Sequence, residues 1–384
     1  MTQQNWEEVT TALVDWMKQS PESIDEVVDL EVGGLFEEEA AWMEVVEGLD
    51  TIELDEVLGA LETPLRESDP YRSARVALFC GSLVEQGADP ELLVDAVVDV
   101  MERCLFEALQ LVVEVEARWD LDSPDDLPDE MLVQFFEQEA MWVKCWRALG
   151  FIILPAMTML ARSVSARERA RERESLLQVV ESMDEIHGLV DYLYQLLFMV
   201  DDKEFLVLHP GETKGFKVHV EGVRNNYHLF TLLQQALLLD PDGPLLTGVT
   251  PEPELGEIAR GEAPLQQPMS DLGLWKYVNW TQMAQHTDVA ALEDEAHQIS
   301  GEGSPLAIRK FRDQRVILLE TTWSQHSWDA NFFAPLHDAL CSKVEVLEIL
   351  SPTEVEHWLQ QFAQQVWIPE DDESEDDDVS SWEA

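Results

Sequence analysis

Three histidines near a polar turn in the second half of the chain have the residue types of a ligand site. His209 and His219 belong to two neighbouring apolar runs, and His228 follows the turn that contains Arg224 and Asn226. If the two runs pair as a hairpin, these side chains gather near the start of the next helix, where free N–H groups bind anions. We therefore predict a site for an anion or a substrate carboxylate. The alternative is an Asn-rich turn with singly exposed histidines.

A short basic segment forms the second candidate site. Arg309, Lys310, Arg312 and Arg315 give it a clear positive excess in a strongly acidic chain. Such a segment attracts acidic groups, either the acidic C-terminal tail of this chain or an acidic partner. We therefore predict that these four residues bind a partner. The alternative is a solvated loop that leads into the next apolar run.

Trp323 and Trp328 belong to the densest aromatic patch of the second half. Aromatic side chains contribute large buried areas in domain cores, and they are also enriched at the cores of protein interfaces. The pattern is therefore compatible with a core and with a partner-binding surface. We include both tryptophans among the predicted partner-binding residues.

Signatures of known catalytic sites are missing from the sequence. It contains no phosphate-binding or dinucleotide-binding glycine motif, no HExxH, no GxSxG and no EF-hand loop. Ser324, His326 and Asp329 supply the residue types of a catalytic triad, but a triad needs geometry that separate elements usually fix. We therefore predict no catalytic residue, no metal site and no cofactor, and favour a protein that is not an enzyme.

The elements around the histidines are predicted as a hairpin followed by a helix. Residues 205–208 and 216–220 have the composition of strands, and two Gly-containing turn signals lie between them. Asn225 and Asn226 then resemble a cap for a helix over 227–239. The stretch 240–268 is rich in Pro and Gly, which favours a loop.

Further strands and a final helix complete a mixed region. Residues 316–319 and 344–349 have the pattern of strands. Ser351, Pro352 and Glu354 combine a cap, a first-turn proline and a capping-box acid, so the last helix begins there. Strands and helices without regular alternation predict a compact α+β domain.

The first two hundred residues are predicted to be almost entirely helical. Apolar residues recur at spacings of three and four, and a stripe over 176–197 must pack on another helix, in this chain or in a partner. The segment 165–175 alternates Arg with other residues and reads as a solvated helix face with ion pairs three residues apart. Segments 36–42 and 136–142 share Phe, Glu, Ala and Trp in register, which suggests a duplicated helical unit or chance similarity.

Composition excludes several classes of function. The chain has 384 residues, of which 78 are acidic and 24 basic, and its formal net charge is −54. Such a charge repels nucleic acids and anionic membranes, so we expect no direct nucleic-acid binding and no membrane binding. An apolar fraction of 46% is enough for a large core. A salt-adapted host proteome would explain most of the acidity.

Four scattered cysteines without a CxxC pair, and the lack of a secretory leader, favour a cytoplasmic protein with free thiols. The most apolar stretch, 148–161, is too short to span a membrane and is broken by Pro155, which favours a buried element. The acid-rich residues after 370 repel one another and are expected to be disordered.

Together these patterns predict a multidomain α+β protein. It consists of an all-helical domain over 1–200, an α+β domain over 201–369 and an acidic disordered tail over 370–384. The similarity of 36–42 to 136–142 suggests that the helical domain is repeat-like. We predict a cytoplasmic interaction or adaptor component of a larger assembly, which docks protein partners through its helical half. One alternative is an enzyme with a site near the 205–228 hairpin. A second alternative is an acidic mimic of nucleic acid.

Overall fold

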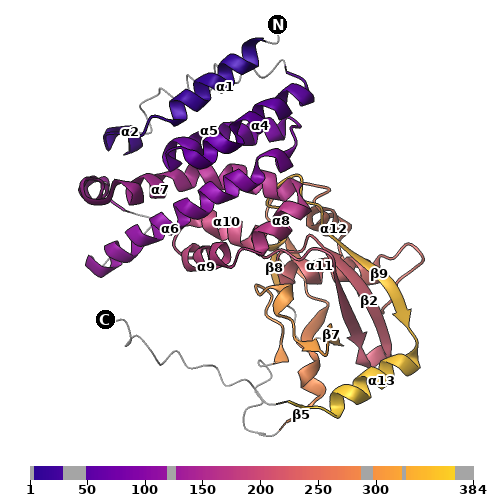
Figure 1. The fold of residues 1–384 in the computed structure, drawn as a ribbon. Helices are drawn as coiled ribbons and strands as arrows, with labels where there is room; N and C mark the ends of the chain where they lie inside the picture. Colours follow the sequence, from indigo (N-terminus) through magenta and orange to yellow (C-terminus); the bar gives the residue numbers. More distant parts are fainter. Residues whose placement is uncertain (1–3, 29–48, 119–126, 287–296, 322–325, 368–384) are drawn as a thin grey trace. The chain divides into compact units, whose positions relative to one another are not determined.

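The N-terminal half of the protein is helical (Figure 1). The computed structural model describes residues 4–28, 49–118, 127–286, 297–321 and 326–367. The helices of this half are α1 (Gln4–Met17), α2 (Asp25–Val28), α4 (Thr51–Glu67), α5 (Pro70–Glu85), α6 (Val94–Arg118), α7 (Asp129–Arg162), α8 (Val164–Arg171), α9 (Glu174–Met183) and α10 (Gly188–Leu197). The predicted helical N-terminal half is confirmed.

Local sequence sets where the helices of this half begin. At the start of α5, the Asp69 carboxylate accepts hydrogen bonds from the backbone N–H groups of Tyr71 and Arg72. At the start of α4, Asp50 and Glu53 form a reciprocal capping box. Because the first N–H groups of a helix have no partner inside the helix, these side chains stabilise both starts.

The apolar stripe predicted over 176–197 occupies two helices and not one. The first, α9, ends at Met183, and the second, α10, begins at Gly188. The stripe residues buried in the core of this half are Leu176, Val179, Met183, Val190, Leu193 and Leu197. The stripe therefore packs within this chain.

One helix of this half has the length and composition of a membrane span. It covers residues 130–162 of α7, and 72% of its most apolar window is buried inside the structure. The predicted buried element over 148–161 is thus part of a core helix that contains Pro155. Burial of this extent is compatible with a soluble protein, because a core helix has the same apolar composition as a span.

Two of the alternating arginines after α7 bind the last carbonyl groups of neighbouring helices. Arg167 is buried and donates to the carbonyl oxygen of Leu160 at 2.6 Å. Arg171 donates to the carbonyl oxygen of Leu197 at 2.5 Å. Carbonyl groups at a helix end lack partners within the helix, so these guanidinium groups stabilise the ends of α7 and α10.

The other two arginines of this segment form ion pairs with acids of α6. Arg169 Nε lies 3.3 Å from Asp95, and Arg173 Nη1 lies 2.6 Å from Asp99. The prediction of a solvated helix face over 165–175 is wrong, since Arg167 is buried and α8 ends at Arg171 before α9 begins. The arginines of 165–175 thus contact α6, α7 and α10. The spacing of charges within the segment could not predict these contacts.

The second half of the chain is built on a six-stranded mixed sheet with the strand order β4-β7-β1-β2-β9, in which β6 also pairs with β7. Its strands are β1 (Lys203–His209), β2 (Lys214–Glu221), β4 (Trp275–Asn279), β6 (Lys310–Phe311), β7 (Gln314–Thr321) and β9 (Lys343–Leu350). Strand β1 runs parallel to β7, and the other pairs are antiparallel. The predicted hairpin and the strands expected at 316–319 and 344–349 are confirmed.

In the described part of the second half, two small sheets and three α-helices accompany the main sheet. Strand β3 (Ser270–Leu272) pairs with β8 (Ser327–Asp329), and β5 (Gln285–His286) pairs with β10 (Val366–Trp367). The helices are α11 (Asn226–Leu238), α12 (Pro253–Arg260) and α13 (Pro352–Ala363). The predicted loop over 240–268 contains α12, so this prediction is wrong in part. The predicted capping box of Ser351 and Glu354 at α13 is confirmed.

Alternation along the strands gives the sheet two apolar faces. Phe205 and Val207 of β1 belong to the core that α11 and α12 cover. Leu206 and Leu208 belong to a second core, which α13 covers. Because successive side chains of a strand point to opposite faces, a strand with this continuous apolar run is buried on both faces.

The chain divides into two units. The helical unit comprises the chain up to Met199 together with Leu336–Leu340, and the sheet unit comprises Val200–Pro335 and the residues from Cys341 onward. The segment 36–42, which resembles 136–142, and the predicted acidic tail over 370–384 lie outside the described residues.

Candidate functional site

Helices α5 and α7 lie side by side in the helical unit and run in the same direction. Near the start of α5, the rings of Tyr71 and Phe151 meet edge to face with centroids 6.1 Å apart. Further along both helices, Glu85 and Arg162 form an ion pair of 2.6 Å. We call the line along which the two helices meet the α5–α7 seam.

A buried ion pair fixes the start of α5 against α7. Lys144 Nζ lies 3.2 Å from Asp69 Oδ2 and 2.7 Å from Ser20 Oγ, and the side chains of Lys144 and Asp69 are 8% and 6% exposed. Asp69 also caps α5, so its carboxylate is fully used. A buried charge without a partner is costly, and this pair therefore holds the two helices in register.

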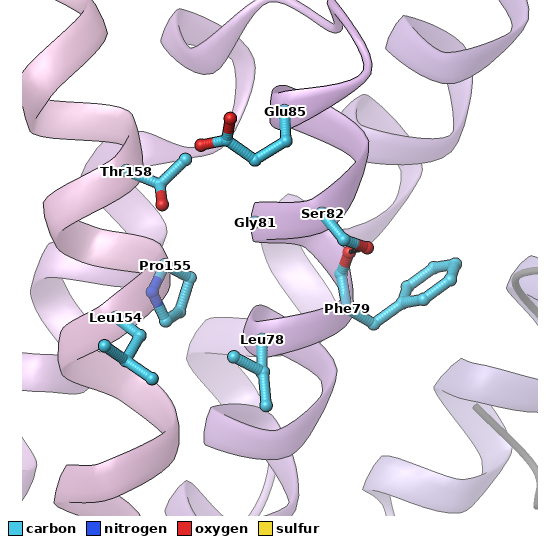
Figure 2. A pocket seen from close by; sticks show the side chains of 8 residues that line it. All are labelled: Leu78, Phe79, Gly81, Ser82, Glu85, Leu154, Pro155 and Thr158. Carbon is cyan, nitrogen blue, oxygen red and sulfur yellow. Dashed lines mark hydrogen bonds between the residues drawn. The ribbon is translucent and has the colours of Figure 1, made fainter. Parts of the chain in front are cut away.

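A largely apolar hollow of about 380 Å³ opens in the middle of the seam (Figure 2). It is lined by Leu78, Phe79, Gly81, Ser82, Glu85, Leu154, Pro155 and Thr158. Figure 2 shows Leu78 and Leu154 at one end and Glu85 and Thr158 at the other. Leu154 is 44% exposed, although most apolar side chains of α7 are buried. The hollow has the size of a ligand or side-chain pocket.

The carboxylate of Glu85 at the polar end of the hollow is already hydrogen-bonded. Arg162 Nη2 donates to it at 2.6 Å, and His337 Nε2 lies 2.8 Å from its second oxygen. Burial raises the pKa of Glu85, but the hydrogen bonds and charges of Arg162 and His337 outweigh burial, and the net pKa is lowered. Glu85 is therefore ionised near pH 7, and the positive charge of Arg162 balances its negative charge.

The opposite end of the seam is cationic and aromatic. The guanidinium carbon of Arg75 lies 5.4 Å from the ring centroid of Phe151 and 5.7 Å from that of Tyr71. In the part of the chain that the structure describes, Arg75 forms no ion pair, and its polar contact is with the Tyr71 hydroxyl at 3.5 Å. A guanidinium group in cation–π contact with rings still has N–H donors available for an anion.

Two further arginines lie near Arg75. Arg72 stacks on the ring of Trp16 at 4.1 Å and pairs with Glu26 at 3.0 Å. Burial raises the pKa of Tyr71, and the positive charges of Arg75, Arg72 and Arg147 act in the opposite direction. The electrostatic influence of three arginines therefore converges on this end of the seam.

The side chains along the seam repeat at spacings of three and four on each helix. They are Arg75, Leu78, Ser82 and Glu85 on α5, and Phe151, Leu154, Thr158 and Arg162 on α7. Residues at these spacings share one face of a helix. The seam is thus a continuous strip with a cationic end, an apolar hollow and a neutralised polar end.

The structure does not bring the predicted histidine cluster together. His209 pairs with Lys214 at the turn of the hairpin, whereas His219 pairs with Glu204 near the other end of β1. His209 is buried, and its Nδ1 accepts from the backbone N–H of Glu212 at 3.1 Å, while burial lowers its pKa. His219 Nε2 lies 2.9 Å from Asp202.

Arg224 and His228 lie in the same segment but bind backbone carbonyl groups. The Arg224 guanidinium donates to the carbonyl oxygen of Phe332 at 2.8 Å and to that of Asn331. His228 is buried, and its Nε2 lies 2.7 Å from the carbonyl oxygen of Ala259. Burial, aided by the charge of Arg224, lowers the pKa of His228 to about 3, so its ring is neutral near pH 7.

The N–H groups at the start of α11 already have acceptors. The N–H of Asn226 donates to Gly303, and its side-chain amide donates to Ser300 at 2.7 Å. The N–H of His228 donates to the side chain of Asn225 at 2.9 Å. The free N–H groups on which the predicted anion site depends are therefore occupied, and anion binding here stays a prediction.

The predicted basic segment forms the tight turn between β6 and β7. Lys310 lies in β6, and Arg312 adopts a left-handed backbone conformation with φ 57°. Arg315 donates to the carbonyl oxygen of Leu306 at 2.8 Å, and burial lowers its pKa. The N–H of Arg309 donates to Asn279. These contacts position the turn, and partner binding by these residues stays a prediction.

Of the two predicted tryptophans, Trp328 is a core residue. It is 3% exposed, and its indole N–H donates to Thr231 Oγ1 at 2.9 Å. Trp323 lies outside the described residues.

A buried carboxyl group in the sheet unit belongs to a closed polar network. Asp271 accepts a hydrogen bond from Gln234 at 3.0 Å, and Gln234 in turn accepts from Tyr277 and from the N–H of Leu274. Burial raises the pKa of Asp271, and hydrogen bonds from Thr231 and Gln234 oppose this. Perturbed carboxyls often mark active sites, but here the polar groups satisfy one another, as in a structural network.

Sequence reasoning missed the α5–α7 seam. A signal was present, since residues 70–84 and 140–161 contain no acidic residue in a chain with 78 of them. Across the described ranges, no group of three or more His, Cys, Asp or Glu side chains is arranged to hold a metal ion. No protein-family model, curated protein or solved structure matches the chain.

Proposed function

We propose that the helical unit is a protein-docking module and that the α5–α7 seam binds an amphipathic segment of a protein partner. The observation that carries this proposal is the preformed apolar hollow between α5 and α7, two helices that ion pairs hold together, with Leu154 exposed beside the hollow. Amphipathic segments bind proteins by placing apolar side chains in such grooves. The protein then acts as an adaptor or regulatory component of a larger assembly.

The energetics of the hollow suit a docking anchor. An apolar side chain that is fully buried contributes about 1.5–3 kcal/mol, and a few such anchors dominate the affinity of most interfaces. The floor and both ends of the hollow are held by contacts within the unit, so little ordering is required of this chain on binding.

Two observations favour docking over the alternatives. The enzyme alternative requires a site near the hairpin, where the polar groups of Arg224, Asn226 and His228 bind the protein's own backbone. The nucleic-acid mimic requires unpaired acids in stripes, and Asp95 and Asp99, which lie one turn apart on α6, do not supply such a stripe because both pair with arginines. Both features lower the support for these alternatives.

Two finer predictions about architecture accompany the proposal. Similarity of 36–42 to 136–142 supports a repeated helical unit, and the run of acids after 370 supports a disordered tail. A cytoplasmic location is supported by the cysteine pattern and by the burial of the apolar helix α7. Each stays a prediction.

Capture of partners from the native host by full-length variants tests the proposal. Leu154→Glu places a charge in the hollow, while Val113→Glu places the same charge on α6 at a position that is 52% exposed. We expect wild type and Val113→Glu to retain one stoichiometric partner that Leu154→Glu loses, with unchanged circular dichroism. Retention of the same partner by all three proteins would contradict docking at the seam.

A further inference from the structure

The two helical stretches that flank the hollow carry basic side chains in a strongly acidic molecule. The net charge of the chain is −54, yet residues 70–84 of α5 and 140–161 of α7 carry basic side chains and no acidic ones. The basic residues of these two stretches are Arg72, Arg75, Lys144 and Arg147. The partner that fits the seam is therefore set by this local charge.

We infer that the partner segment is acidic, and that it places a carboxylate on Arg75 and an apolar side chain in the hollow. This inference rests on the docking function proposed above and specifies its partner. Arg75 is half-buried and forms no ion pair among the described residues, whereas Arg72 and Lys144 already bind Glu26 and Asp69. A partner carboxylate would supply the charge-assisted hydrogen bonds that the described residues do not give to Arg75.

Three aromatic rings lie within cation–π distance of the guanidinium group of Arg75. Its guanidinium carbon lies within 6.0 Å of the ring centroids of Trp16, Tyr71 and Phe151. Contacts with these rings restrict the side chain and so reduce the rotamer entropy lost on binding, and the edge of a guanidinium group matches the two oxygens of a carboxylate.

The polar end of the hollow offers no competing attraction for a basic segment. Glu85 is the acid that lines the hollow, and Arg162 and His337 already bind its two oxygens. A lysine or arginine of a partner would have to displace one of these groups. An acidic segment meets no such cost at Arg75.

Helix geometry sets the spacing of the two groups on the partner. Arg75 precedes Leu78 by three residues on α5, which is about one helical turn, or roughly 5 Å along the axis. A helical partner therefore presents its Asp or Glu and its Leu or Phe three or four residues apart. Repulsion from the rest of the molecule is screened beyond about 8 Å at physiological ionic strength, so the local charge decides recognition there.

Two labelled synthetic peptides test the inference. They are amphipathic helices of identical sequence with one Leu, preceded four residues earlier by Glu in the first peptide and by Lys in the second. Fluorescence anisotropy at physiological ionic strength measures their affinity for the full-length protein. We expect the Glu peptide to bind about tenfold more tightly, in keeping with a charge-assisted hydrogen bond.

Variants of the protein identify the side chain that recognises the charged residue of the peptide. Arg75→Gln should remove the preference for the Glu peptide, and Arg75→Glu should reverse it. Lys203→Glu changes the net charge of the molecule as Arg75→Glu does, but at an exposed site in the sheet unit, and should leave the preference unchanged. Circular dichroism confirms that each variant is folded.

The outcomes separate this inference from the docking function. Equal affinity for both peptides, or tighter binding of the Lys peptide, with both affinities lost in Leu154→Glu, would overturn the acidic partner and leave docking at the seam intact. Absence of saturable binding by either peptide, or binding that Leu154→Glu leaves unchanged, would contradict both.

Discussion

Gly81 of α5 lies so close to Pro155 of α7 that a Cβ atom at position 81 would come within 2.9 Å of the Pro155 Cβ and 3.1 Å of its Cα. Glycine is required here because any side chain would meet a rigid ring and the backbone behind it. The contact forms the floor of the hollow, so the depth of the docking site depends on the close approach of these two helices.

Replacement of Gly81 by alanine should force α5 and α7 apart. We expect Gly81→Ala to lower the free energy of unfolding by about 1–3 kcal/mol, as overpacked cores do. Gly150→Ala in α7 is the matched control, since its Cβ meets nothing within 4 Å, and it should stabilise the protein by about 1 kcal/mol. Urea denaturation of both variants measures the difference, and equal effects would show that the Gly81 contact is not tight.

Loss of one member of the buried pair between Lys144 and Asp69 should be strongly destabilising. We expect Lys144→Met to cost about 3–5 kcal/mol, because it leaves a buried carboxylate without its cation. The double variant Lys144→Met/Asp69→Asn should recover part of this loss, since asparagine still caps α5 without a charge. A double-mutant cycle from urea denaturation gives the coupling, and strictly additive losses would show that the two groups act independently.

The ion pairs between α6 and the segment after α7 should respond to salt. Arg173 binds Asp99 and Glu102, and its side chain is 26% exposed. We expect Arg173→Met to lower the free energy of unfolding by about 1 kcal/mol at low salt and by less at 1 M NaCl, where the charges are screened. A loss that stays constant with salt would indicate packing of the arginine stem and not its charge.

Acid should destabilise the sheet unit through His228. Burial lowers the pKa of this histidine to about 3 in the folded protein, whereas an unfolded chain has about 6.5. Its neutral form therefore stabilises the fold fully above pH 6.5, and this contribution is lost as the pH falls from 6.5 toward 3, by up to about 1.4 kcal/mol per pH unit.

The variant His228→Gln tests this pH dependence, because glutamine can still donate to the carbonyl of Ala259 but does not titrate. We expect the variant to be less stable than wild type at pH 7, with the difference narrowing as the pH falls toward 4. His209, whose pKa burial also lowers, is present in both proteins and cancels from the comparison. A difference that is independent of pH would contradict the account of His228.

Local sequence predicted those elements whose signals are complete within a few residues. Ser351 and Glu354 define the start of α13 because the capping box needs no distant group. The hairpin of β1 and β2 follows in the same way from two apolar runs and a turn. Conversely, the regular spacing of the stripe over 176–197 predicts one helix and does not show the break before Gly188.

The candidate site could not be predicted because its residues meet only in the folded chain. Glu85 binds His337 across 252 positions of sequence, and Leu154 faces Leu78 from a different helix. Arg173 has acidic neighbours in the sequence, Glu172 and Glu174, but its ion pair is with Asp99 of α6. Local spacing cannot reveal such choices, since tertiary packing decides them.

Site-specific photo-crosslinking in the native host tests the docking function most directly. A photoreactive residue at position 154 lies beside the hollow, and the same residue at position 113 lies at another exposed position of the helical unit. We predict one discrete crosslinked partner from position 154, which disappears when Arg75→Glu is added, and none from position 113. The same products from both positions, or none from position 154, would contradict docking at the α5–α7 seam.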